Sequence, residues 1–191
     1  MSLVESSVQV TTEEMLALPE NGMDWELIRG EVREQPVILR QAEQATIMAI
    51  LAHALGKWQV KRQKPRVRVV SGEAGFRLRR DPDTTVGIDV SYVSPEVAAT
   101  LLSGFPYFDG PPVLAVEILS PSDTHQGVTE KIKVYQKCDV PIIWIVNPDD
   151  RTVIVYRRGS LPRLFNLQDE LSCEPEMPGF RLPVADIFDY E

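Results

Sequence analysis

The chain has 191 residues, of which 43% are hydrophobic and 25% charged, and its formal net charge is −8. This length and composition are typical of a soluble globular protein, and we expect one domain over residues 1–191. An acidic chain is not suited to bind nucleic acid through its overall charge, so such binding would need a local basic surface. No apolar run approaches the ~20 residues that span a bilayer. Residues 1–10 also lack the pattern of a secretory signal, so we expect a cytoplasmic protein without membrane contact.

The first third of the chain predicts a short helix, a hairpin and a long helix. Residues 11–14 combine threonine and glutamate before two apolar residues, which is typical of a capped helix start. Residues 25–34 (WELIRGEVRE) alternate with period two around Gly30, which predicts a hairpin. Apolar residues at helical spacing predict an amphipathic helix over residues 40–59.

The rest of the chain reads mainly as strands, with one further long helix. The predicted elements in order are strands at 66–70, 75–79 and 86–93, a loop at 94–110 with a short helical piece, a strand at 113–119, a helix at 128–138, strands at 141–146 and 152–156, and a closing helical turn at 184–188. The strand–helix–strand order of 113–146 predicts a parallel pair joined by the helix. We therefore expect an α+β fold with a mixed β-sheet flanked by helices.

Glu117 is the most informative single residue. It lies in the apolar run PVLAVEILSP, residues 112–121, which is typical of a buried central strand. An unpaired carboxylate in such a strand is costly, so Glu117 must either pair with a cation or belong to a functional site.

Asp89 is the natural partner for Glu117. It lies near the end of the preceding predicted strand, and a return of the chain through the 94–110 loop could bring the two carboxylates together. Two carboxylates at strand ends form an oxygen-rich site suited to Mg²⁺ or Mn²⁺, and the backbone carbonyl of Ile118 could be a further ligand. With two histidines and two isolated cysteines, a Cys/His zinc site is not expected.

A lysine on the following helix would complete a catalytic group. Lys131 lies four residues before Tyr135 and shares its apolar face, whereas Lys133 points away at roughly 100° per residue. Lys131 could orient or deprotonate an attacking water and offset charge on a phosphate. By residue type alone, a structural salt bridge between Glu117 and Lys131 explains the pattern as well as a metal site does.

The motifs WELIRGE, GFRL, GIDVSYVS, VLAVEILSPSD and EKIKVYQKCDVPIIWIVNPD, in this order, resemble the Uma-two family, which is classed with restriction endonucleases of the PD-(D/E)XK superfamily. The resemblance covers roughly residues 11–160. It implies a restriction-endonuclease-like core in which Asp89 and Glu117 bind the metal and Lys131 assists catalysis. Leu119 occupies the position at which the parent motif has its lysine, which fits a lysine that has moved to the helix.

The resemblance implies a metal-dependent endonuclease that hydrolyses phosphodiester bonds in DNA. Cleavage of both strands would need two copies, so we expect a homodimer, with the aromatic part of the 94–110 loop as a contact region. The alternatives are a catalytically decayed protein of the same fold with a binding or structural role, and a nuclease acting on RNA. The basic residues expected to contact nucleic acid are Lys61, Arg62, Lys64, Arg77 and Arg79.

Several acidic residues could lie at the edge of the site. Glu73, Glu43 and Glu31 are the candidates, and Glu26 is a further one because it flanks the same predicted turn as Glu31. The chain departs from the family where its long helix opens with Glu43 and Gln44 instead of a histidine and a polar residue. It also has Ile88 in place of the usual proline before Asp89, and Gly127 where an acidic residue often precedes the lysine.

Overall fold

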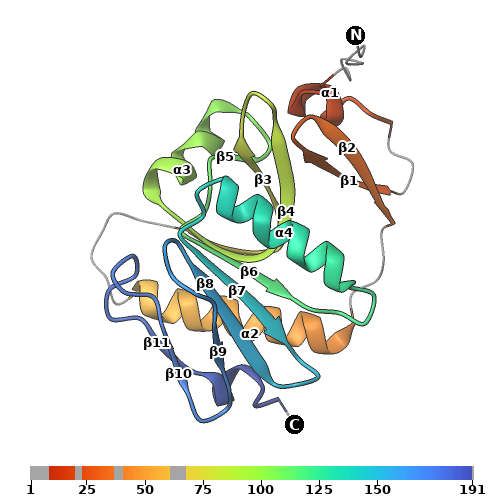
Figure 1. Ribbon diagram of the computed structural model, residues 1–191. Coiled ribbons are helices and arrows are strands. Elements are labelled where there is room, and N and C mark those ends of the chain that lie inside the picture. The colour runs from red at the N-terminus through yellow and green to blue at the C-terminus, as the bar shows by residue number, and fades with distance from the viewer. Residues whose placement is uncertain (1–8, 20–22, 37–40, 61–67, 191) are drawn as a thin grey trace.

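The computed structural model describes residues 9–19, 23–36, 41–60 and 68–190. Over these residues the chain forms a mixed β-sheet with helices on both faces, which confirms the predicted α+β class (Figure 1). The helices are α1 (Thr12–Leu16), α2 (Ala42–Val60), α3 (Pro95–Ala99) and α4 (His125–Lys137), with 3-10 helices η1 (Thr100–Ser103) and η2 (Val184–Ile187). The strands are β1 (Met23–Ile28), β2 (Glu31–Pro36), β3 (Arg68–Arg79), β4 (Thr84–Val93), β5 (Phe108–Asp109), β6 (Leu114–Ile118), β7 (Ile142–Asn147), β8 (Thr152–Arg157), β9 (Arg163–Phe165), β10 (Glu170–Ser172) and β11 (Arg181–Pro183).

The main sheet has the order β2-β1-β4-β6-β7-β8-β9, with β3 paired to β4 and β5 paired to β3. Strands β6 and β7 are parallel and are joined by α4, which confirms the predicted strand–helix–strand unit. The predicted β1–β2 and β7–β8 hairpins are also present as antiparallel pairs. In the described part of the chain, no helix is long and apolar enough to cross a membrane.

Side chains on β6 alternate between the two faces of the sheet. Leu114, Val116 and Ile118 pack in the same core cluster as the inner face of α2. Ala115 belongs to the cluster that includes Ile132 of α4, so α4 covers the opposite face (Figure 1). Because successive strand residues point to opposite faces, Glu117 lies on the α4 side together with Ala115.

Strand β4 changes its partner along its length. Near its start it pairs with β1 at Leu27 and Thr85, and near its end it pairs with β6 through Val90 and Val116. Strands β1 and β6 therefore separate from each other beside the middle of β4. Asp89 lies at this fork, and not at the end of its strand as the sequence suggested.

Residues 68–79 form one strand, whereas the sequence predicted two strands, at 66–70 and 75–79. The register of β3 against β4 shifts between Ser71 and Ala74, so Gly72 and Glu73 together oppose the single residue Asp89. This is a β-bulge, and both bulge residues have positive φ, 90° at Gly72 and 56° at Glu73. The glycine tolerates this conformation, which lets the strand continue through the gap between the two predicted strands.

The aromatic residues of the 94–110 segment pack on their own chain. The guanidinium carbon of Arg77 lies 4.2 Å from the centre of the Phe105 ring. Tyr107 lies so close to Gly75 that a Cβ there would come within 2.3 Å of the ring. These rings therefore help to fold the segment onto β3, and their suggested role as a dimer contact stays a prediction. Leu102 remains exposed.

Candidate active site

Asp89 and Glu117 are brought side by side by strand register. The pairing of Val90 with Val116 places Asp89 opposite Glu117, on the face that α4 covers. The carboxylate of Asp89 accepts a hydrogen bond from the backbone N–H of Ile118 at 2.8 Å. Both acidic residues are buried, with 4% of Asp89 and 9% of Glu117 exposed. The expected convergence of these two acids is therefore present.

Two side chains of α4 reach Glu117. Lys131 Nζ lies 2.8 Å from Glu117 Oε2 and donates a hydrogen bond to it. Tyr135, one helical turn later, donates its hydroxyl to Glu117 Oε1. Lys133 is exposed, so the helix presents the lysine that the spacing favoured. The salt bridge considered from the sequence is present, and it lies at the proposed metal site.

The electrostatics of the group are dominated by burial. Burial raises the pKa of Glu117 to about 7, with Asp89 adding to the rise and Lys131 opposing it. Burial would lower the pKa of Lys131, but the charges of Glu117, Glu26 and Asp89 outweigh it and raise this pKa above its ordinary value. The amine is thus an ammonium ion in a cluster of carboxylates. The pKa of Tyr135 is also raised by burial and by Glu117, which keeps its hydroxyl a donor.

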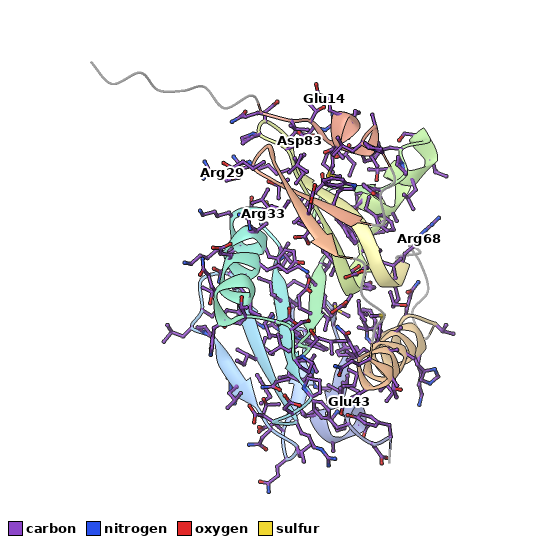
Figure 2. All side chains as sticks on the ribbon, turned by 90° about the vertical axis from the view of Figure 1, so that its right-hand side faces the viewer. Glu14, Arg29, Arg33, Glu43, Arg68 and Asp83 are labelled. Carbon is purple, nitrogen blue, oxygen red and sulfur yellow. The ribbon has the colours of Figure 1, made fainter. Side chains whose placement is uncertain are left out.

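Glu26 of β1 is a fourth charged residue at the site. Its Oε1 lies 3.9 Å from Lys131 Nζ. The β1–β2 hairpin is also tied to α4 by Arg33, whose guanidinium lies 3.1 Å from Glu130 (Figure 2). Glu31, the other candidate from this hairpin, is exposed at its turn. The hairpin therefore contributes Glu26 to the site.

Glu73 and Glu43 lie in different places relative to the site. Glu73 is an exposed residue of the bulge that opposes Asp89, and a Cβ added at Gly87 would lie 3.4 Å from its Cβ. Glu43 accepts a hydrogen bond from the hydroxyl of Tyr190, which ties the first turn of α2 to the C-terminal segment. Figure 2 shows Glu43 beside this segment, at the start of α2. Strand register thus brings Glu73, and not Glu43, next to Asp89.

Gln44 follows Glu43 on α2 and reaches the site through the backbone. Its side-chain amide donates a hydrogen bond to the carbonyl of Ile118 at 2.9 Å. This carbonyl was the expected third metal ligand. Sequence inspection noted Gln44 only as a departure from the family pattern.

Arg77 is not available to contact nucleic acid. Its side chain is 3% exposed and binds Asp109 at 2.7 Å and Glu13 at 2.6 Å. The hydrogen bonds that Arg77 donates to Asp109, followed by the one it donates to Glu13, raise its pKa despite burial. The alternating pattern of the strand suggested an outward arginine, but the 94–110 segment and α1 cover it. This part of the sequence prediction is therefore corrected.

The other basic residues predicted to contact nucleic acid have two outcomes. Arg79, at the end of β3, is exposed. Lys61, Arg62 and Lys64 lie outside the described residues.

The donors at the site suit a hard divalent cation. Asp89 and Glu117 supply carboxylate oxygens from adjacent strands, and Ile118 supplies a carbonyl oxygen at the same fork. Oxygen ligands of this kind are those that Mg²⁺ and Mn²⁺ prefer. Over the described ranges, no group of three or more His, Cys, Asp or Glu side chains is arranged to hold a metal. The site would therefore rely on two carboxylates, the carbonyl and water.

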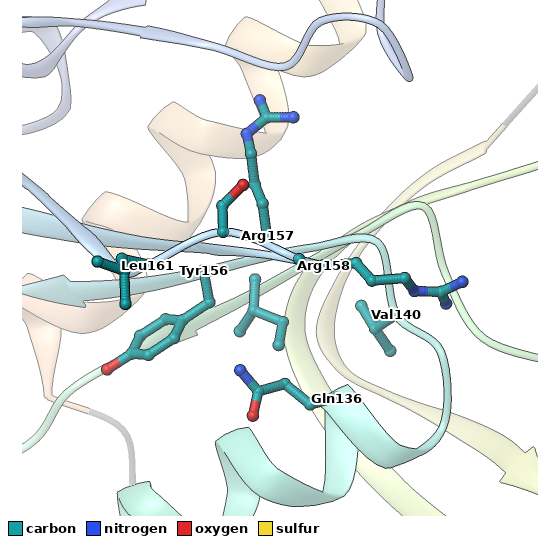
Figure 3. A pocket seen from close by; sticks show the side chains of 9 residues that line it. Gln136, Val140, Tyr156, Arg157, Arg158 and Leu161 are labelled. Atoms are coloured by element: carbon teal, nitrogen blue, oxygen red, sulfur yellow. The ribbon is translucent and has the colours of Figure 1, made fainter.

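A surface hollow of about 400 Å³ lies elsewhere, between the end of α4 and strand β8. Figure 3 shows Gln136, Val140, Tyr156 and Arg158 around it. Its lining includes none of Asp89, Glu117 and Lys131. The candidate site is identified by converging charged groups and not by the shape of the surface.

Sequence reasoning missed part of the site. Tyr135 was assigned to the core, although its spacing from Lys131 already placed the two on one helical face. Glu26 and Glu31 were equal candidates, because a hairpin pattern does not say which strand faces the site. No local signal pointed to Gln44, since its partner is a backbone carbonyl far away in the chain.

Comparison with known proteins places these features in a family. A search of curated proteins gave no match. The chain resembles the crystal structure of a "putative nuclease belonging to DUF820" from Anabaena variabilis ATCC 29413, with a TM-score of 0.74 and 24% sequence identity. This match covers 94% of our chain and 97% of that chain, and it confirms the restriction-endonuclease-like fold. Residues 12–185 match the Uma2 family, which is described as "Putative restriction endonuclease". The chain therefore belongs to the Uma2 family, as the sequence motifs suggested.

Proposed function

We propose that this protein is a divalent-metal-dependent endonuclease that hydrolyses phosphodiester bonds in DNA. The observation that carries this proposal is the meeting of Asp89, Glu117 and Lys131, which come from β4, β6 and α4 and lie around one point at the strand fork. Two buried acids and an amine at one place have a cost in stability, so a functional role is the natural explanation. Membership in the Uma2 family supports the same reaction class.

Each residue has a role that its position suggests. Asp89, Glu117 and the Ile118 carbonyl would hold Mg²⁺ or Mn²⁺. Such an ion acts as a Lewis acid, which polarises a phosphate oxygen and lowers the pKa of a bound water. Lys131, held as an ammonium ion by Glu117 and Glu26, would donate hydrogen bonds to the phosphate and offset its developing charge. Tyr135 fixes the Glu117 carboxylate from the other side.

DNA binding requires a basic surface, because phosphate contacts supply most sequence-independent affinity. We propose Arg79 as one such contact, together with Lys61, Arg62 and Lys64. Double-strand cleavage further requires two active sites, so we propose a homodimer. Light scattering coupled to size exclusion tests the dimer directly.

The decisive experiment is a cleavage assay with two isosteric variants. Purified protein is incubated with supercoiled and linear DNA in Mg²⁺ or Mn²⁺, and with single-stranded DNA and RNA in parallel. Asp89→Asn and Glu117→Gln should each abolish cleavage while remaining folded, because they remove a ligand charge at nearly constant volume. Glu31→Gln, at the exposed hairpin turn, is the matched control and should cleave normally. Full cleavage by Glu117→Gln would refute the assignment, and activity on RNA alone would change the substrate.

A catalytically inactive protein of the same fold is the second candidate. It is favoured by one observation, that both oxygens of Glu117 already accept hydrogen bonds, from Lys131 and Tyr135. A stable ion pair of this kind could be purely structural. Titration with Mn²⁺ separates the candidates, since an inactive protein would neither bind the ion nor cleave any of the substrates.

A further inference from the structure

The backbone of Ile118 is held in an unusual way at the strand fork. The N–H of Leu119 bonds to Val146 on the β7 side, so the N–H and C=O of Ile118 point toward β4. If the β4–β6 ladder continued by one more step, these groups would pair with Ile88. The ladder ends at Val90 instead, because β4 turns toward β1.

Two side chains replace the missing ladder bonds. The Asp89 carboxylate accepts the Ile118 N–H at 2.8 Å, and the Gln44 amide donates to the Ile118 carbonyl at 2.9 Å. A carbonyl oxygen has two lone pairs, so it can accept the amide hydrogen bond and still bind a cation. The hydrogen bond fixes the direction of the carbonyl and leaves its second lone pair available.

Gln44 is carried by a well-anchored helix. Ile47, Met48 and Leu51 on the inner face of α2 are buried in the core against the sheet. The first turn of α2 is further tied to the C-terminal segment by the hydrogen bond from the Tyr190 hydroxyl to Glu43. The amide is therefore presented to Ile118 from a fixed position, as a supporting residue must be.

We propose that Gln44 is a positioning residue that orients the Ile118 carbonyl toward the divalent cation. This inference rests on the metal site proposed above. In this role Gln44 would touch neither substrate nor ion. It would affect how tightly the ion binds, and not the chemical step.

The test compares divalent-ion affinity in matched glutamine variants of the full-length chain. Gln44→Met keeps the length of the side chain but cannot donate, and Gln44→Asn keeps the amide but is one methylene too short. Gln41→Met, at an exposed glutamine just before α2, is the control. Affinity for Ca²⁺ is measured by calorimetry and for Mn²⁺ by electron paramagnetic resonance, with thermal unfolding recorded for every variant. Both Gln44 variants should bind the ions roughly tenfold more weakly, and the control should match the wild type.

The possible results are distinguishable. If the Gln44 variants lose thermal stability but bind both ions as tightly as the wild type, Gln44 is only a structural cap and the inference is overturned. If the wild type itself binds neither ion, the proposed metal site fails and the inference fails with it. If Gln44→Met does not fold, Gln44→Asn alone decides, because its polar side chain can be solvated at this half-buried position.

Discussion

Replacing Lys131 by methionine would test whether its ammonium group balances the buried acids. It would also test whether a divalent ion can take over that role. Lys131 is the cation that balances Glu117 at 2.8 Å and Glu26 at 3.9 Å in the structure. Methionine keeps the apolar stem and removes the ammonium. Glu117 would then be a buried acid close to Asp89 without a cationic partner and with its pKa raised further, and we expect the protein to lose stability.

The size of the loss follows from burial. Removing one partner of a fully buried ion pair costs about 3–5 kcal/mol. The Lys131 side chain is 29% exposed, so solvent screens part of this effect and we expect about 2 kcal/mol. For a chain of this size, that corresponds to a fall in Tm of about 4–8 °C. A divalent ion at a hundred times its Kd should return about 2.7 kcal/mol, so Mn²⁺ should restore the Tm of the variant.

Thermal unfolding with and without Mn²⁺, followed by circular dichroism, measures these shifts. Lys133→Met is the matched control, because Lys133 lies on the same helix but is exposed. Its Tm should stay near that of the wild type. In the cleavage assay, Lys131→Met should be inactive even when Mn²⁺ has restored its stability, since the donor to the phosphate is missing.

Two results would refute this reasoning. A variant that is as stable as the wild type without metal would show that Lys131 does not balance the buried acids. A variant that is destabilised but gains nothing from Mn²⁺ would show that the carboxylates do not form a cation site.

Three further predictions concern the surroundings of the site. Glu26→Gln should reduce the cleavage rate while Glu31→Gln leaves it unchanged, which steady-state kinetics would show; equal rates would exclude Glu26 from the site. Arg79→Met should weaken DNA binding and reduce the slope of log affinity against log salt concentration by about one. An unchanged slope in filter-binding assays would remove Arg79 from the interface. Hydrogen bonds from Arg77 hold the pKa of Asp109 at about 2, below its ordinary 3.8, so its ionised form stabilises the fold by roughly 2 kcal/mol above pH 4. This contribution to the stability is lost as pH falls from about 4 to about 2. The stability of Asp109→Asn, followed over the same acid titration, should not show that loss.

Much of the site could be predicted from local sequence because buried positions recur with the period of the strand or helix that carries them. The apolar run around Glu117 marked a buried strand, and a lone carboxylate within it was conspicuous for physical reasons. Helical spacing distinguished Lys131 from Lys133, which the structure bears out by contact and by exposure. The order of strand, helix and strand then indicated the parallel pair of β6 and β7.

Other features depend on which strands meet, and local sequence does not contain that information. The pattern of β3 looks the same whether Arg77 faces solvent or lies under another segment, and only the packing of the 94–110 segment buries it. The bulge opposite Asp89 and the change of partner along β4 are properties of strand pairs. Gln44 reaches the Ile118 carbonyl only because the fork leaves this carbonyl without a ladder partner beside the first turn of α2. The sequence by itself marked the buried strands and the carboxylate within one of them, whereas long-range register decided which charged residues meet, because a hydrogen-bonded ladder fixes neighbours that are far apart along the chain.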